Sequence, residues 1–548
     1  MKRFSKATEL AALFALAAAF LVIKPATAGL WQYSATIDSV TSGEIHDHPR
    51  AYLWIPPKCK QVRAVIVAQH NLLEESILLN PKFRHELEKQ NMAEVWIMPN
   101  IDFTFDFHKG AGDAFDDMMK TLAATSGYSE LRYAPVIPIG HSAAASYPWN
   151  FAAWAPGRTL AALSVHGDTP RTNLTGNGAK YPDWGNITLD GIPGLFAMGQ
   201  FEWWDKRTQP GLDYVAEHPG TPLAMLPDIG HGHFDTSDDQ VRFLAMFIRK
   251  AAQYRLPMTS SVDGPVALRP VDPKRGWLVD RWSPDTGRKF VAAPYAEYKG
   301  DRANAFWCFD EEMAKATEAY GAVRTLTDKR SIIYVQAGKV MAPSGGLFCP
   351  KLATDDDGKT FRFSTYLVDG TIAPGTDWTK DLAKSTHAAK LTPKVLCGPI
   401  AQVDESTYRI EFDQSGFASA YRSYNAFITT MVPTEWKEMV RSQAAGIFVA
   451  HNTTGAENAI TFPVPADVSD RRPIKLSATA SSGLPVAYYV DSGPAVIEGN
   501  TLTFTPIPPR SKFPVEVRVV AWQWGRAGAS PVKSAEPVYI TFHITKGE

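Results

Sequence analysis

Apolar residues in the first half of the chain form short continuous runs separated by amphipathic stretches. The runs are Arg63–Ala68, Val95–Met98, Val136–Ile139, Leu160–His166, Gly194–Met198 and Pro222–Leu226. Continuous runs of this length are typical of strands buried on both faces. The stretches between them include the predicted helices Phe83–Gln90, Phe115–Ser126 and Gln240–Tyr254. Strands that alternate with helices predict an α/β fold with a doubly wound, mostly parallel sheet.

The pattern changes on both sides of this region. Trp31 to Ile55 alternates apolar and polar residues around a Thr-Ser-Gly break, which predicts a β-hairpin at the entry to the sheet. Residues 257–275 are rich in Pro, Ser and Asp and are predicted to be a linker. Residues 276–460 contain one predicted helix, Asp310–Tyr320, among short alternating runs, which predicts a mostly β domain. Residues 461–548 contain regularly spaced strand-like runs, which predict a β-sandwich.

The N-terminus has the pattern of a secretory signal peptide. A basic start with three cationic residues is followed by an apolar core, Ala11–Ile23, and by the small-residue site Ala26-Thr27-Ala28. We therefore expect residues 1–28 to be removed and the α/β domain to occupy residues 29–256. An N-terminal membrane anchor is the alternative. No later stretch has transmembrane length, so the protein is expected to be secreted or periplasmic, without an integral membrane span.

Composition narrows the set of partners. The chain has 548 residues, enough for two or three domains. Its formal net charge is −1, which gives no reason to expect nucleic acid or an anionic membrane as a partner. The four cysteines, Cys59, Cys308, Cys349 and Cys397, have no C-x-x-C spacing that would indicate zinc. One disulfide between residues 300 and 400 is compatible with export, but the pairing and the oligomeric state stay open.

The strongest chemical motif follows the run Val136–Ile139. Gly140-His141-Ser142-Ala143-Ala144 turns sharply from a predicted strand into small, helix-compatible residues. This is the pattern of a nucleophile elbow, in which a tight turn holds a serine hydroxyl clear of the backbone. The fifth position is Ala144 instead of the glycine of the strict G-x-S-x-G pattern.

Partners for Ser142 occur later in the chain in the order acid, then histidine. Glu202 follows the Gly194–Met198 run and is the predicted acid, with Asp205 and Asp168 as alternatives. His231 follows the last predicted strand and is the favoured base, because Gly230 and Gly232 leave its ring free to turn; His233 is its rival. Ser142, Glu202 and His231 would form a catalytic triad that needs no metal or organic cofactor.

The predicted oxyanion hole has two parts. One N–H group belongs to Ala143, the residue after the nucleophile. The other comes from Gln69-His70-Asn71-Leu72, which follows the Arg63–Ala68 run; Leu72 is the expected donor and Asn71 the next candidate. Two such donors contribute several kcal/mol of transition-state stabilisation, on the order of 3 kcal/mol each.

These ordered motifs make residues 45–255 resemble a secreted α/β-hydrolase of the esterase, dienelactone-hydrolase and prolyl-oligopeptidase-like clan. The resemblance implies an α/β-hydrolase fold and a serine hydrolase acting on carboxylic esters. Separately, Ala478-Thr-Ala-Ser-Ser-Gly-Leu-Pro-Val486 with Gly499-Asn-Thr-Leu-Thr-Phe504 resembles bacterial immunoglobulin-like modules. That resemblance implies a fold and an extracellular setting for residues 461–548.

Aromatic residues suggest the substrate class. Trp203 and Trp204 flank the acid, and we expect them, with His70, to contact substrate, because aromatic faces stack on sugar rings or hold an aromatic acyl group. The leading substrate is a small ester or an ester-decorated polysaccharide carrying acetyl, feruloyl or methyl uronate groups. The alternatives are a peptidase or lipase of the same fold, a metal-dependent hydrolase using the His231/His233/Asp235 run with the His46/His48 pair, and a non-catalytic glycan-binding protein.

Overall fold

A computed structural model describes the chain from residue 30 to residue 547. Within that span it leaves out 44, 103, 174–179, 204, 260, 321–329, 342, 345–348, 370–374, 376, 378–388, 392, 413–423, 431–439, 442–444 and 450. The predicted signal peptide and Trp204 lie outside the described residues. No helix in the described part of the chain is long and apolar enough to cross a membrane.

The first region is built on an eight-stranded sheet with the order β1-β2-β4-β3-β5-β6-β7-β8. Pairings from β4 to β8 are parallel, whereas β1 and β2 pair antiparallel with each other, and β2 pairs antiparallel with β4. The strands are β1 (Tyr33–Thr36), β2 (Arg50–Trp54), β3 (Ala64–Gln69), β4 (Met92–Met98), β5 (Val136–His141), β6 (Ala162–Val165), β7 (Gly194–Gly199) and β8 (Leu223–Asp228). This is the sheet of an α/β-hydrolase, so the predicted fold class and its entry hairpin are confirmed.

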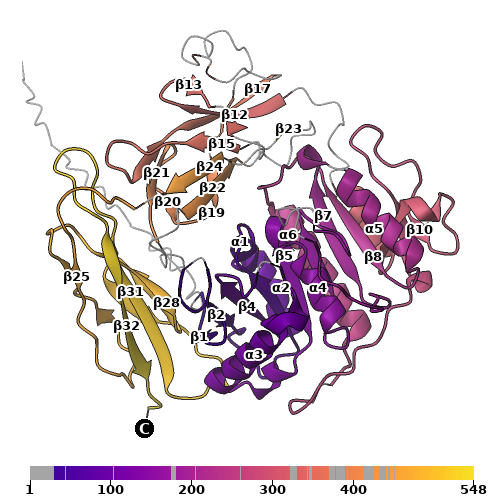
Figure 1. Cartoon of the computed structure of the whole chain (residues 1–548), viewed down its shortest axis with the longest axis horizontal. Helices are drawn as coiled ribbons and strands as arrows, with labels where there is room; N and C mark the ends of the chain where they lie inside the picture. Colours follow the sequence, from indigo (N-terminus) through magenta and orange to yellow (C-terminus); the bar gives the residue numbers. More distant parts are fainter. Residues whose placement is uncertain are drawn as a thin grey trace, which may run out of the picture.

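The side chains of β3 point alternately to the two faces of the sheet, and a layer of helices covers each face. Val65 and Val67 pack into one buried cluster, which includes residues of α3 (Gly112–Ser126) and α4 (Tyr147–Trp154). Ile66 and Ala68 pack into the cluster on the other face, with α2 (Pro81–Gln90) and α6 (Asp238–Arg255). Because successive side chains of a strand point to opposite faces, a continuous apolar run requires cover on both sides. Figure 1 shows these helices on the sheet, with α5 (Asp205–Glu217) beside β8.

The segment after α6 packs back onto this region. Strands β9 (Trp277–Asp280), β10 (Ala293–Pro294) and β11 (Ala305–Cys308) form a small antiparallel sheet. Helix α7 (Glu311–Ala319) follows, and its Met313 and Ala314 join the buried cluster of α6. Lys250 of α6 forms an ion pair with Asp310 at 2.6 Å, at the start of α7. Residues 277–319 therefore share a core with the hydrolase sheet.

Beyond α7 the described residues form β-sheets. One contains β12 (Arg330–Gln336), β13 (Lys339–Val340), β17 (Ser364–Asp369), β18 (Ala389–Leu391) and β23 (Val440–Arg441); a second contains β14 (Pro343–Ser344), β15 (Cys349–Leu352), β19 (Pro393–Cys397), β22 (Tyr424–Thr430) and β24 (Ala445–Val449); a third contains β16 (Thr360–Arg362), β20 (Ile400–Gln402) and β21 (Thr407–Ile410). The expectation of a mostly β region is confirmed in these residues.

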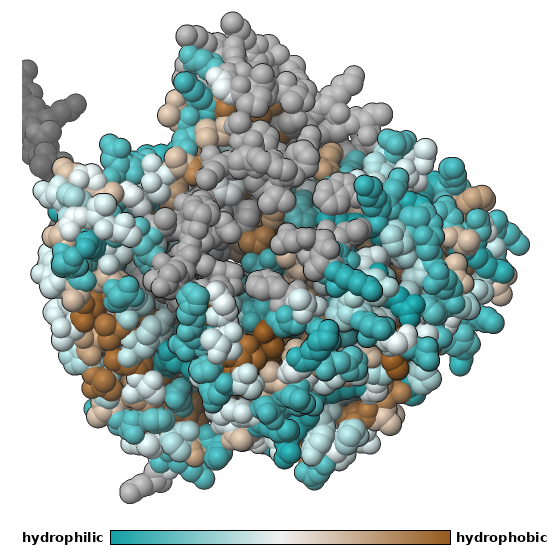
Figure 2. Space-filling view, in the orientation of Figure 1, coloured by the Kyte–Doolittle hydropathy of each residue, from teal (hydrophilic) through white to brown (hydrophobic). Residues whose placement is uncertain are grey.

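The C-terminal strands form a β-sandwich that leans on the hydrolase region (Figure 1). Its sheets contain β25 (Ile460–Thr461) with β27 (Thr479–Ala480), β26 (Ile474–Lys475) with β30 (Thr501–Phe504) and β29 (Ala495–Glu498), and β28 (Ala487–Ser492) with β31 (Val515–Gln523) and β32 (Ala535–Ile544). Val517, Val519 and other inward residues belong to the same buried cluster as β1 and α3, whereas Val520 and Trp522 pack with the middle β sheets. On the face shown in Figure 2, apolar side chains gather at the left, over the C-terminal strands, and the hydrolase surface is mostly hydrophilic.

Polar contacts reinforce this shared core. Arg510 forms an ion pair with the buried Glu130 at 3.0 Å, and Tyr52 of β2 donates to Asp491 at 3.1 Å. Lys512 N–H donates to the carbonyl of Ser126, the last residue of α3, at 3.0 Å. The sandwich is thus attached through its core and through hydrogen bonds. Two cysteine thiols, Cys59 and Cys308, are buried and free, and the Cys349 side chain lies outside the described residues.

Candidate active site

The candidate nucleophile lies at the end of a fully buried strand. Ser142 follows β5 and has φ of 52°, in the left-handed region that non-glycine residues rarely adopt. The turn needs small neighbours: a Cβ on Gly140 would lie 2.0 Å from the carbonyl oxygen of Ala144, and one on Gly167 would lie 1.9 Å from Ala145 Cβ. These contacts explain why positions 140 and 167 are glycine and why position 145 carries a small side chain.

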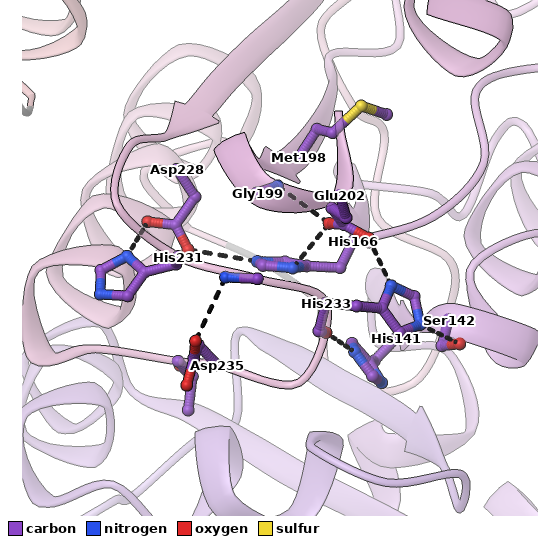
Figure 3. A network of polar contacts seen from close by, with 12 residues as sticks. His141, Ser142, His166, Met198, Gly199, Glu202, Asp228, His231, His233 and Asp235 are labelled. Atoms are coloured by element: carbon purple, nitrogen blue, oxygen red, sulfur yellow. Dashed lines mark hydrogen bonds and ion pairs between the residues drawn. The ribbon is translucent and has the colours of Figure 1, made fainter. Parts of the chain in front are cut away.

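Two side chains extend from Ser142 into a hydrogen-bonded chain (Figure 3). Ser142 Oγ lies 2.7 Å from His233 Nε2. On the far side of the ring, His233 Nδ1 hydrogen-bonds Glu202 Oε2. Glu202 lies in the short turn Gln200–Glu202 after β7, where its Oε1 accepts the Gly199 N–H at 2.9 Å. Ser142, His233 and Glu202 are therefore arranged as a serine, a base and an orienting acid.

The favoured prediction of His231 beside Ser142 is wrong in the structure, which places His233 there. His231 Nδ1 instead contacts Asp228 Oδ1 at 2.8 Å, and the side chain is 13% exposed. Asp228 ends β8 three residues earlier and is fully buried, so it holds His231 on the opposite side of the loop. Asp228, three residues before His231, is the sequence feature tied to this placement, but its spacing alone does not rank the two histidines.

The loop that carries His233 is held by its surroundings. His141 is fully buried, and its Nε2 lies 2.9 Å from the His233 carbonyl oxygen. Burial lowers the pKa of His141 well below its usual range, so the ring is neutral and can donate one N–H. The Phe234 ring packs edge-on against His233, with centroids 4.7 Å apart. These contacts fix His233 from two sides.

The alternative acids lie elsewhere. The Asp205 side chain is 76% exposed and pairs with Arg281 at 2.6 Å. Asp168 is buried beside Thr172, whose hydroxyl lies 3.3 Å from Asp168 Oδ1. The carboxylate that hydrogen-bonds His233 is that of Glu202.

The predicted oxyanion donors are only partly in place. Ala143 lies in the turn Ser142–Ala144, and its role as an oxyanion donor stays a prediction. The Leu72 N–H, however, donates to Glu74 Oε2 at 2.9 Å, so the structure contradicts its prediction as a free donor. Glu74 opens α1 (Glu74–Leu78), and its Oε1 also accepts the His141 N–H at 2.7 Å. Asn71 Nδ2 donates to the His141 carbonyl at 2.7 Å.

Sequence reasoning missed Glu74. Its carboxylate is fully buried and ties the loop after β3 to the last residue of β5. Burial raises the pKa of Glu74 to about 7, although the facing N–H groups oppose this shift. Glu74 therefore braces the nucleophile turn from beneath, and its charge changes near neutral pH.

A second missed residue, His166, lies behind Glu202. It is fully buried, follows β6, and has φ of 50°. Its Nδ1 lies 2.7 Å from Glu202 Oε1, and its Nε2 lies 3.2 Å from Asp228 Oδ2. Burial would lower the pKa of His166, but the two carboxylates raise it to about 10. Burial would raise the pKa of Glu202, but His166 and His233 hold it well below its usual range.

The residues of the predicted metal run are separated. His231 contacts Asp228, His233 contacts Ser142 and Glu202, and Asp235 Oδ2 accepts the Gly232 N–H at 3.2 Å. Among the described residues, one group has ligand atoms within 4.8 Å of one another: His166, Glu202 and His233. Ligands around tetrahedral zinc are about 3.3 Å apart, from bonds of about 2.0 Å. The 2.7 Å separation of His166 and Glu202 is that of an ion pair instead.

Two residues predicted to contact substrate, Trp203 and His70, pack against different aromatic side chains. Trp203 follows Glu202 and packs edge-on against Trp282, with centroids 5.1 Å apart. His70 packs edge-on against Trp96 of β4 at 5.6 Å. Sequence reasoning missed an apolar group beside His233, in which Phe234 and Leu72 pack with Leu396 of β19. The middle β region therefore reaches the neighbourhood of the candidate site.

Comparison with protein-family models gives no match, and comparison with curated proteins gives none either. Among solved structures, the chain is similar to the fluorophosphonate-binding serine hydrolase FphF of Staphylococcus aureus, with 12% identity, 40% of this chain, 97% of that chain and a TM-score of 0.28. It is also similar to an IroE-like serine hydrolase from Shewanella oneidensis, with 11% identity, 40% of this chain, 80% of that chain and a TM-score of 0.29. A third neighbour is the S-formylglutathione hydrolase FrmB of Staphylococcus aureus, with 14% identity, 40% of this chain, 97% of that chain and a TM-score of 0.26. At this level of similarity, the chemistry of the site must be judged from its own geometry.

Proposed function

We propose that the protein is a serine hydrolase that cleaves carboxylic esters through an acyl-enzyme. The observation that carries this proposal is the chain from Ser142 Oγ to His233 Nε2, at 2.7 Å, and from His233 Nδ1 to Glu202. It starts from a serine held at φ of 52° on a strand-to-helix turn. A serine hydroxyl is a weak nucleophile, and a hydrogen-bonded, oriented histidine is the group that activates it.

In the proposed reaction, His233 accepts the Ser142 proton as Oγ attacks the ester carbonyl. Glu202 holds the ring with Nδ1 protonated and stabilises the charged imidazolium that forms. The Ala143 N–H donates a hydrogen bond to the oxyanion that develops on the carbonyl oxygen. His233 then gives its proton to the departing alcohol, and a water molecule repeats the sequence to release the acid.

The proposed substrate is an ester-decorated carbohydrate carrying acetyl, feruloyl or methyl uronate groups. The Trp203 ring supports it, because it is partly exposed next to Glu202 and is held by the buried Trp282, and exposed aromatic faces stack on sugar rings. The N-terminal sequence supports export of the chain, which would bring it to extracellular polysaccharide.

The test is hydrolysis of an ester panel by the purified mature chain, with p-nitrophenyl acetate, methyl ferulate, a methyl glucuronate and acetylated xylan. Ser142→Ala and His233→Ala should each lower kcat by about 10⁴-fold or more, the usual cost of losing a triad member. His231→Ala is the matched control and should stay within about tenfold, because His231 contacts Asp228 and not Ser142. Equal losses in the two histidine variants, or full activity in Ser142→Ala, would reject the assignment.

A further inference from the structure

His166 is not one of the three residues Ser142, His233 and Glu202, but it is fully buried and lies next to the Glu202 carboxylate. Its ring is fully buried and lies between the carboxylates of Glu202 and Asp228 (Figure 3). We propose that His166 is a positioning residue: its ring joins Glu202 to Asp228 and thereby holds the Glu202 carboxylate where it orients His233. This inference rests on the proposed serine hydrolase function.

Each ring nitrogen faces a carboxylate oxygen, which favours a proton on it, although the Gln240 amide nitrogen, itself a donor, also lies 2.7 Å from Nε2. Nδ1 lies 2.7 Å from Glu202 Oε1, off the axis of a straight hydrogen bond, so this contact acts as an ion pair. Nε2 lies within hydrogen-bond distance of Asp228 Oδ2, at 3.2 Å. If a ring nitrogen were unprotonated, its lone pair would point at the lone pairs of a carboxylate oxygen. This repulsion is costly in a buried site, where water cannot screen it.

Charge balance leads to the same protonation state. Two buried carboxylates, Glu202 and Asp228, face the ring, and one guanidinium, that of Arg207, lies 3.5 Å from Glu202 Oε2. A charged His166 supplies the second positive charge that the pair of carboxylates requires. The pKa of His166, raised to about 10, agrees with this balance. The charged and titratable groups around His166 are Glu202, Asp228, Arg207, His141 and His233, and Asp228 is also contacted by His231 and Tyr320.

The backbone at His166 supports a positional role. Its φ of 50° is unfavourable for a residue with a side chain, and such strain persists where the surroundings hold it in place. Arg207 Nη1 donates to the His166 carbonyl at 3.3 Å. Gln240 of α6 donates to Asp228 Oδ2 at 2.9 Å and also lies 2.7 Å from His166 Nε2. The far end of the ring is therefore fixed to the closing helix of the domain.

The principal test compares wild type with His166→Gln, which keeps similar bulk and a donor but carries no charge. His85→Gln is the matched control, because His85 is an exposed residue of α2. We expect His166→Gln to lower kcat by about 100-fold, the cost of a small misplacement of catalytic groups. We also expect the acid limb of its kcat/KM profile to move to higher pH. Without the facing positive charge, the Glu202 carboxylate takes up a proton more readily and then no longer orients the base.

The pH profile separates positioning from simple stability. If His166 only fills space, His166→Gln lowers the unfolding temperature, and the acid limb stays where it is in wild type; that result would overturn the proposal. If wild-type activity depends on Ser142 and kcat is unchanged in His166→Gln, the positioning role of His166 is rejected and the proposed function stands. Absence of Ser142-dependent activity in wild type would instead reject the proposed function.

A second measurement does not need a folded His166 variant or any turnover. In wild-type protein with ¹⁵N-labelled histidine, the ring-nitrogen shifts distinguish an imidazolium from a neutral tautomer. The signals of His166 are assigned by their loss in His166→Gln or, if that variant does not fold, by their change in Asp228→Asn once the signals lost in His231→Ala have been set aside, because Asp228 contacts both rings. We expect both nitrogens to be protonated at pH 8. A neutral ring that accepts a hydrogen bond from Gln240 at that pH would overturn the proposal.

Discussion

Replacing Glu202 with glutamine tests the triad more sharply than removing it. Glu202 Oε1 accepts the Gly199 N–H at 2.9 Å and lies 2.7 Å from His166 Nδ1. These two donors require an acceptor, so the oxygen of the new amide must stay on that side. Its NH₂ group then faces His233 Nδ1, in the place where Glu202 Oε2 now accepts.

This orientation forces the wrong tautomer of His233. An amide donor facing Nδ1 requires an unprotonated Nδ1, which moves the proton to Nε2. Nε2 lies 2.7 Å from Ser142 Oγ and then donates to the serine instead of accepting its proton. The same exchange of acid for amide in a serine protease lowers kcat by about 10⁴-fold. That factor corresponds to about 5.4 kcal/mol of activation free energy, at 1.36 kcal/mol for each factor of ten.

The assay is steady-state hydrolysis of p-nitrophenyl acetate by Glu202→Gln and by Asp205→Asn. KM should change little in Glu202→Gln, because the lost interaction orients the base and does not bind substrate. Asp205→Asn should keep kcat within about twofold, because an exposed ion pair contributes little. Retention of more than about a tenth of wild-type kcat by Glu202→Gln would refute the reasoning, as would an equal loss in Asp205→Asn.

Two further predictions concern the supports of the site. Glu74→Gln leaves one of two N–H groups, the part-buried one of Leu72 or the buried one of His141, without an acceptor, so denaturant unfolding should show a free energy of unfolding lower by about 1–3 kcal/mol. The pKa of Glu74 is raised from 4.5 to about 7, so the folded state binds more protons between these values. Its contribution therefore makes stability fall as pH rises through that window, and a slope that is the same in Glu74→Gln would contradict this account. Arg510→Ala leaves the buried Glu130 without its cation, so we expect a loss of about 2 kcal/mol, and unchanged stability would show that the sandwich is held without this pair.

The fold was largely predictable because burial on both faces is visible in sequence. The apolar run at Val136–Ile139 and its neighbours required two covering layers, and the structure supplies them. The shared core between β1 and the C-terminal sandwich was not predictable, since Tyr33 and Val517 are nearly 500 positions apart. Each of these two apolar strands can be buried by any apolar surface, so its pattern does not name the partner. The mostly β domain predicted for residues 276–460 likewise gave no hint that Leu396 packs beside Phe234.

The candidate site was predictable where position along the chain determines it. Ser142 and Glu202 follow parallel strands at their carboxyl ends, so topology brings them together. The choice between His231 and His233 depends on loop direction, which Asp228 fixes through a contact that spacing alone does not rank. In the sequence, His166 is only the last residue of an apolar run. Its two carboxylate partners, Glu202 and Asp228, are distant from it along the chain, so the sequence does not connect them.

The central claim, an activated serine at position 142, is tested most directly by peptide mapping after reaction with a fluorophosphonate. The wild-type protein, Ser142→Ala and His233→Ala are each treated with the probe, with and without EDTA, and the modified peptide is identified by mass. We expect one adduct on Ser142 in wild type, insensitive to EDTA, greatly slowed in His233→Ala and absent in Ser142→Ala. An adduct on another residue, or no adduct on a protein that hydrolyses esters only without EDTA, would contradict the account.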